Sequence, residues 1–74
     1  MKKDNELRQI ISKNLTLCRE EKGMSQTELG KVFNKAKTTV ASWEQGISLP
    51  DAALLYRIAQ YYNKPIDYFF ERRE

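Results

Sequence analysis

One short polar stretch in the middle of the chain has side chains that could bind an anionic, hydrogen-bonding partner. Lys37, Thr38, Ala41 and Ser42 share one side of a helix, because positions three and four residues apart lie on the same face. A lysine ammonium donates to guanine acceptors, serine and threonine hydroxyls bond several bases, and alanine can touch a thymine methyl group. No carboxylate occurs in this stretch before Glu44. A slim helix face of this kind could enter the major groove of duplex DNA.

The charge distribution agrees with a polyanionic partner without proving one. The chain has 74 residues and a net charge of +3. Most of the excess lies in residues 31–46, where Lys31, Lys35 and Lys37 face only one acid, Glu44. A positive segment attracts polyanions, although a solvated helix face would explain three lysines equally well.

The composition argues against several classes of protein. The chain has no histidine and a single cysteine, Cys18, so it offers no histidine acid–base pair and no His/Cys zinc site. We therefore expect no enzyme activity, no metal and no cofactor, and we interpret Cys18 as a small buried hydrophobic residue. No apolar run forms a signal-peptide core or approaches the length that spans a bilayer. We expect a soluble, cytoplasmic protein.

The apolar residues follow a helical period throughout, and no segment alternates like a strand. The sequence therefore predicts an all-α fold in one domain over residues 1–74. Five helices are expected, over residues 5–22, 25–33, 37–44, 51–62 and 65–70. Asp51 is a suitable N-cap for the fourth helix, and Pro65 suits the first position of the fifth.

The best-defined boundary is the start of the second helix. Ser25 and Glu28 have the spacing of a capping box, and Met24 could pack on Leu29 as a hydrophobic staple. At the other end, Asn34 tolerates the positive φ of a tight turn. Two short helices joined by such a turn need a scaffold, because neither is stable alone.

The second and third helices are expected to pack against each other at a steep angle, as in a helix-turn-helix. Leu29, Phe33, Val40 and Trp43 would form the apolar wedge between them, so we interpret Trp43 as a core residue. Gly30 lies inside the second helix at a cost of about 1 kcal/mol relative to alanine. The absence of a side chain there predicts a close approach by the third helix.

Three motifs at this spacing resemble a known family. They are SQTELG at residues 25–30, VASWEQG at 40–46 and Leu49-Pro50, and they are similar to the Cro/phage-repressor (xenobiotic-response-element) type of helix-turn-helix domain. The resemblance extends outward from Asn14 to Phe70. It implies a compact five-helix, lambda-repressor-like domain of bacterial or phage origin with its helix-turn-helix at residues 25–45. It also implies a homodimer that binds an inverted-repeat operator in double-stranded DNA and regulates transcription, most simply as a repressor.

The resemblance assigns roles to individual residues by position. Base-reading positions are Lys37, Thr38 and Ser42, with Ala41 beside them. Phosphate-binding positions are Gln26, Thr39 and Gln45, and Lys35 adds positive charge near them. Glu44 corresponds to a structural position.

The sequence departs from the family pattern at three positions in and around the third helix. Ala36 stands where the family usually has a Ser or Thr N-cap, Asn34 where glycine is common, and Gln45 where asparagine is common. These departures bear on where the third helix starts and how it is pitched.

Two alternatives remain open at this level. The same fold could serve as a protein-binding module, such as an antitoxin-like or adaptor protein, although such a protein has no need of a carboxylate-free, lysine-bearing helix face. The aromatic residues near the C-terminus could either close the core or form a dimer interface through Tyr61, Tyr68 and Phe70.

Overall fold

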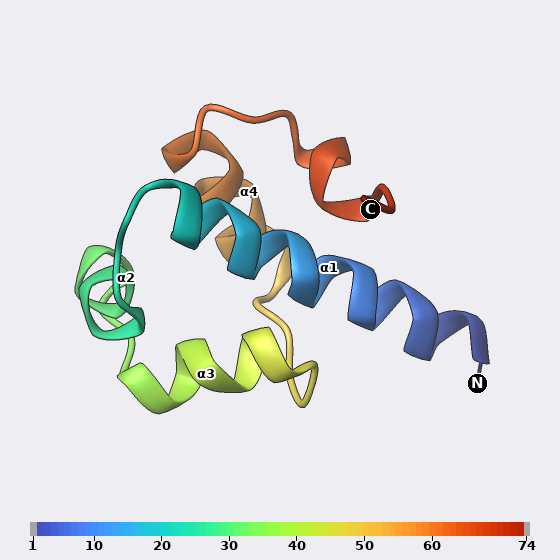
Figure 1. Ribbon diagram of the computed structural model, residues 1–74, viewed down its shortest axis with the longest axis horizontal. Helices are drawn as coiled ribbons and strands as arrows, with labels where there is room; N and C mark the ends of the chain where they lie inside the picture. The colour runs from blue at the N-terminus through green and yellow to red at the C-terminus, as the bar shows by residue number, and fades with distance from the viewer. Residues whose placement is uncertain (1, 74) are drawn as a thin grey trace.

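The computed structural model describes residues 2–73, with side chains from Asn5 onward, and contains no strand within that range. Four α-helices and one 3₁₀ helix follow one another along the chain (Figure 1). They are α1 (Lys2–Glu21), α2 (Gln26–Phe33), α3 (Lys37–Gln45), α4 (Ala52–Tyr61) and the 3₁₀ helix η1 (Ile66–Phe70). The all-α prediction is confirmed.

The expectation of five α-helices is wrong by one element, because residues 66–70 form a 3₁₀ helix. The backbone N–H of Tyr68 bonds the carbonyl of Pro65 three residues back, and Glu71 is already extended. This segment is short, and the side chain of Asn14 holds carbonyls that a longer α-helix would use for itself. The first helix also begins earlier than expected, at Lys2. The prediction placed its start too late because the apolar periodicity begins only at Leu7.

The remaining helix ends follow from local sequence. The capping box at α2 is present in both directions, from Glu28 N–H to Ser25 Oγ at 3.0 Å and from Ser25 N–H to Glu28 Oε1 at 2.7 Å. Asp51 caps α4 by accepting from Leu54 N–H at 2.8 Å. Asn34 takes the left-handed conformation after α2, with φ of 58°. All three predicted signals are therefore confirmed.

The long helix α1 runs through the centre of the molecule, with α3 on one side and η1 on the other (Figure 1). α2 packs against α3, and η1 packs against α4. The core between these elements consists of Ile11, Leu15, Cys18, Leu29, Phe33, Val40, Trp43, Leu54, Leu55, Ile58, Ala59, Tyr62 and Phe69. The four residues of the predicted wedge between α2 and α3 belong to this cluster. Cys18 belongs to it too, so its predicted burial is confirmed. No helix in the described range is long and apolar enough to cross a membrane.

A buried amide joins the first element to the last. The Nδ2 group of Asn14, whose side chain is almost fully buried, lies within hydrogen-bond distance of the carbonyls of Tyr68, Phe69 and Glu71, at 3.3, 3.1 and 2.9 Å. The hydrogen bond to the Phe69 carbonyl is buried, and leaving this carbonyl without a partner would be costly. Asn14 therefore fixes η1 on the side of α1 that faces away from α3.

Candidate nucleic-acid interface

The angle between α2 and α3 is set by a backbone contact at Gly30. A Cβ atom at this position would lie 2.3 Å from the carbonyl oxygen of Lys35, closer than real Cβ atoms approach other atoms. The N–H of Lys35 also bonds the carbonyl of Gly30 at 2.8 Å. The predicted close approach at Gly30 is therefore present, but its partner is the turn that leads into α3 rather than α3 itself.

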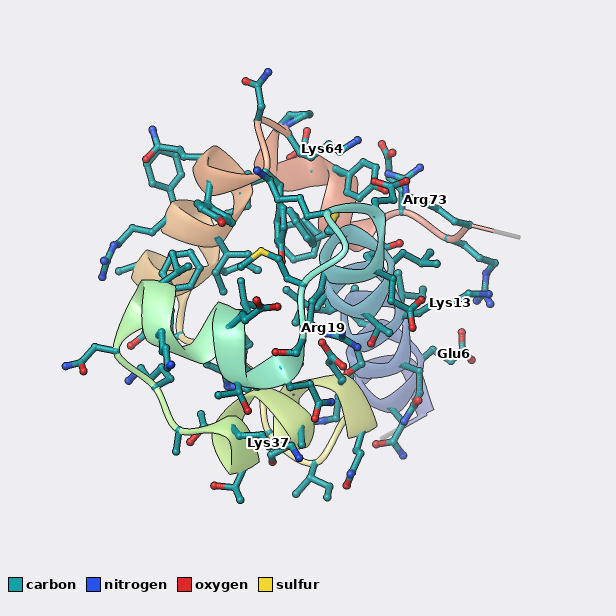
Figure 2. All side chains as sticks on the ribbon, turned by 60° about the vertical axis from the view of Figure 1, so that its left-hand side comes forward. Glu6, Lys13, Arg19, Lys37, Lys64 and Arg73 are labelled. Atoms are coloured by element: carbon teal, nitrogen blue, oxygen red, sulfur yellow. The ribbon has the colours of Figure 1, made fainter. Side chains whose placement is uncertain are left out.

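A charged cluster fastens α3 to α1 and α2. Arg19 donates from Nε and Nη2 to the two carboxylate oxygens of Glu44, at 2.6 and 3.1 Å, and from Nη1 to the carbonyl of Met24 at 2.7 Å. Both side chains are largely shielded, with exposed fractions of 14% and 7%. The hydrogen bond to this carboxylate raises the pKa of the guanidinium, so Arg19 stays charged. Figure 2 shows Arg19 in the space between α1 and α3.

Gln26 belongs to the same cluster. Its Nε2 group donates to Glu44 Oε1 at 2.9 Å, which orients the amide at the first turn of α2. A primary amide has two N–H donors, so the second one can still serve an external acceptor. Arg19 neutralises Glu44, so this carboxylate would not repel a phosphate placed beside Gln26.

α3 has one buried side and one open side. Val40 and Trp43 have exposed fractions of only 0% and 4% and face the core. On the open side, Lys37 and Thr38 are exposed, while Ala41 and Ser42 are half-buried. Figure 2 places Lys37 on α3, at the surface of the molecule. The four predicted base-reading residues thus lie together on the face that the packing leaves accessible.

The predicted phosphate-binding residues surround this face. Gln45 follows at the end of α3 and Lys35 precedes it, both exposed, and Thr39 is half-buried in the first turn. With Gln26 on α2, they frame the open side of α3. We refer to these residues and the base-reading four as the α3 face: Gln26, Lys35, Lys37, Thr38, Thr39, Ala41, Ser42 and Gln45.

The start of α3 lacks the side-chain cap that its family pattern would supply. Ala36 has the extended φ and ψ of an N-cap, −71° and 155°, but no oxygen to accept from the first turn. The helix nevertheless begins at Lys37 as predicted. The Gly30 contact and the buried Val40 therefore define its start without a cap.

The loop after α3 contributes a feature that sequence reasoning missed. Gly46 ends the helix with φ of 77°, and the chain then folds back so that Ser48 Oγ lies 2.8 Å from Ser42 Oγ. One hydroxyl of the pair must donate to the other, and this restricts how Ser42 can present itself to a ligand. Arg19 was also missed, since nothing in its local sequence signals a partner 25 residues away.

The three aromatic residues named for a dimer interface differ in how accessible they are. Tyr61 packs edge-on against Phe33 and bonds Met24 Sδ, and the ring of Tyr68 is covered by the Arg73 guanidinium at 3.4 Å. Phe70 is 41% exposed. Tyr61 and Tyr68 therefore take part in internal packing, and Phe70 offers the most open ring of the three.

Comparison with protein-family models identifies this architecture. The model of the helix-turn-helix family, of the Cro/C1 type, matches residues 15–69, which is well over half of the chain. The chain belongs to this helix-turn-helix family, whose members are DNA-binding domains rather than enzymes. Searches of curated proteins and of solved structures gave no match.

Proposed function

We propose that the protein binds a specific sequence in double-stranded DNA as a homodimer and represses transcription from the promoter that contains it. Each protomer inserts α3 into the major groove. Two copies in successive major grooves on one side of the duplex lie about 34 Å apart. The operator is then an inverted repeat, and the protein works in the compartment that holds the chromosome.

One observation carries this proposal: the open side of α3 combines a cation, hydroxyls and a methyl group with no carboxylate. Lys37, Thr38, Ala41 and Ser42 have the chemistry that base edges in the major groove require. The acid of α3, Glu44, is turned inward and paired with Arg19. Phosphates would therefore approach the α3 face without repulsion from α3.

Phosphate contacts hold the protein in register in this scheme. Gln26, Thr39 and Gln45 present polar groups at the rim of the α3 face, and Lys35 adds a positive charge. Such contacts carry affinity and position but little sequence information. Sequence preference then depends on Lys37, Thr38, Ser42 and Ala41.

The proposed dimer contact is centred on Phe70, and Tyr61 and Tyr68 are its other candidate members. An exposed aromatic ring on a small domain is typical of an interface residue. η1 carries Phe70 and lies on the other side of α1 from α3 (Figure 1), so pairing there would leave the α3 face open.

A binding selection from random duplexes at moderate salt tests the proposal. Enrichment of an inverted repeat with half-sites about one helical turn apart supports a dimeric regulator. Enrichment of a single half-site argues against the dimer. If weak, salt-sensitive binding is found without any enrichment, the sequence-specific role is wrong, and the protein-binding alternative gains support. Reporter expression with and without the protein then distinguishes repression from activation.

A further inference from the structure

Ile47 is the most exposed large hydrophobic side chain among the described residues. Its exposed fraction is 71%, against 41–53% for Leu7, Val32, Tyr56 and Phe70. Single aliphatic residues are common on protein surfaces, so exposure alone indicates no function. The position of Ile47 is what distinguishes it.

The loop that carries Ile47 folds back beside the open side of α3. The N–H of Ile47 bonds the carbonyl of Ser42 at 3.1 Å, and the next residue, Ser48, meets Ser42 hydroxyl to hydroxyl at 2.8 Å. In Figure 1 this loop follows directly on the C-terminal end of α3. Ile47 therefore adjoins Ser42, one of the residues proposed to read bases.

The backbone at Ile47 is held on both sides. Before it, Gly46 donates to the carbonyl of Trp43, and a Cβ at Gly46 would lie 2.9 Å from the Gln9 side chain of α1. After it, Leu49 packs against the core and Pro50 is buried. The entropy of ordering this loop has already been lost on folding, so a contact through Ile47 would need little further ordering.

The surroundings of Ile47 suit DNA better than a protein partner. No acid occurs from Gln45 to Pro50, and the carboxylate of Asp51 accepts from the N–H of Leu54. A stable protein interface needs roughly 1,000 Å² of buried surface or more, whereas Ile47 stands alone in its loop. A thymine presents one methyl group in the major groove, which a single aliphatic side chain can cover.

We propose that Ile47 contacts the 5-methyl group of a thymine at the end of each half-site, beyond the base pair that Ser42 reaches. This inference rests on the proposed function, since it requires α3 to lie in the major groove. It adds a specificity-determining residue outside α3 and predicts a thymine preference at one flanking position.

The test repeats the selection from random duplexes with three proteins: wild type, Ile47→Ala and Val32→Ala. Val32 is a matched control, because it is also an exposed branched aliphatic residue but borders the groove towards α4. We expect all three to select the same central bases, and Ile47→Ala alone to lose the thymine at the flanking position. Thermal melting followed by circular dichroism checks that both variants are folded.

A second measurement identifies the methyl group as the contact. The selected duplex is made with thymine or with deoxyuridine, which lacks the methyl group, at the flanking position. Wild type should bind the deoxyuridine duplex about three- to tenfold more weakly per half-site, as expected for losing a small apolar contact. Ile47→Ala should bind both duplexes equally, at the weaker level.

Three outcomes would overturn the inference while leaving the proposed function intact. Ile47→Ala could select the same flanking thymine as wild type. It could lose the same affinity for thymine and deoxyuridine duplexes, which would exclude the methyl group. It could instead weaken dimerisation in sedimentation without changing half-site preference, which would make Ile47 a dimer contact. If wild type itself enriches no sequence, the proposed function fails and the Ile47 contact fails with it.

Discussion

Arg19 on α1 holds Glu44 on α3 through two parallel hydrogen bonds, Nε to Oε2 at 2.6 Å and Nη2 to Oε1 at 3.1 Å. A third nitrogen of the same guanidinium bonds the carbonyl of Met24, just before α2. One side chain thus joins α1, the entry to α2 and the end of α3. The forked geometry is specific to arginine, because a lysine ammonium is a single point donor.

Replacement of this arginine should destabilise the protein even when the charge is kept. We expect Arg19→Lys to lower the free energy of unfolding by about 1.5–3 kcal/mol, the usual value of hydrogen bonds to a charged group. Arg72→Lys is the control, since Arg72 is 64% exposed and its ion pair with Glu6 is long, at 3.8 Å. Urea unfolding measures both. If the two variants lose the same free energy of unfolding, the paired hydrogen bonds from Arg19 to Glu44 contribute no more to stability than an exposed arginine does.

Gly30→Ala should be destabilising although alanine is the better helix former. The added Cβ would lie 2.3 Å from the Lys35 carbonyl, and the turn before α3 would have to move. We expect a loss of about 1–3 kcal/mol from overpacking, against the gain of about 1 kcal/mol that alanine brings inside an open helix. Lys31→Ala, an exposed change in the same helix, serves as control. If Gly30→Ala is as stable as wild type, the close contact between Gly30 and the Lys35 carbonyl does not determine the geometry of the turn.

Ala36→Ser should stabilise the protein. Residue 36 already has N-cap dihedral angles, so a serine Oγ could accept from the first turn of α3 without rearrangement. The gain expected is about 0.5–2 kcal/mol, measured as a shift of the urea midpoint at constant slope. Ser25→Ala at the start of α2 is the converse experiment and should lose a similar amount. No gain in Ala36→Ser would mean that the turn holds residue 36 in place too rigidly for its side chain to cap.

Ser42→Ala and Gln26→Ala should affect DNA binding in different ways. If Ser42 reads a base, its loss should reduce discrimination at one base pair by about 1–3 kcal/mol. Gln26→Ala should weaken cognate and random duplexes alike, because phosphates carry no sequence information. Titrations of both variants against selected and scrambled duplexes measure this contrast. A uniform loss in Ser42→Ala, or a sequence-dependent loss in Gln26→Ala, would contradict the roles proposed for them.

We expect Tyr62 to make the free energy of unfolding fall at alkaline pH. Its hydroxyl is buried and has no hydrogen-bond partner within the described residues, and burial raises the pKa of this phenol well above its usual value of about 10. The neutral phenol is therefore favoured in the folded state, and this contribution is complete below about pH 10 and lost as the pH rises through the folded pKa. Tyr62→Phe should keep stability near pH 7 and show a smaller loss between pH 9 and pH 11 in urea unfolding. Parallel pH profiles for the two proteins would disprove this.

The helix boundaries that the sequence predicts correctly are those with local signals. These signals are the Ser25–Glu28 capping box, Asp51 before α4 and Asn34 after α2. Each acts on residues no more than four positions away, so its effect can be predicted from the local sequence. The four base-reading candidates could be placed on one side of α3 for the same reason, because Lys37, Thr38, Ala41 and Ser42 recur at helical spacing. Asn14 lies at helical spacing from the buried Ile11 and Cys18, so its own burial also follows a local pattern.

What the sequence could not reveal depends on contacts across long distances in the chain. Arg19 bonds Glu44, which lies 25 residues further along the chain. Asn14 bonds carbonyls of η1, which lie more than 50 residues further along. These contacts determine the 3₁₀ geometry of η1 and the attachment of α3, and neither leaves a local pattern. The Ser42–Ser48 hydroxyl pair is closer in sequence, but it exists only because Gly46 turns the chain back.

The attachment of α3 is confined to one side of the helix. Val40, Trp43 and Glu44 provide its burial and its ion pair, whereas Lys37, Thr38 and Ala41 lie on the open side. The residues that hold α3 in place and those proposed to read DNA are therefore separate sets within a single nine-residue helix. Substitutions on the open side could accumulate with little loss of folding, so the same scaffold could diverge into a series of regulators with mutually exclusive operators.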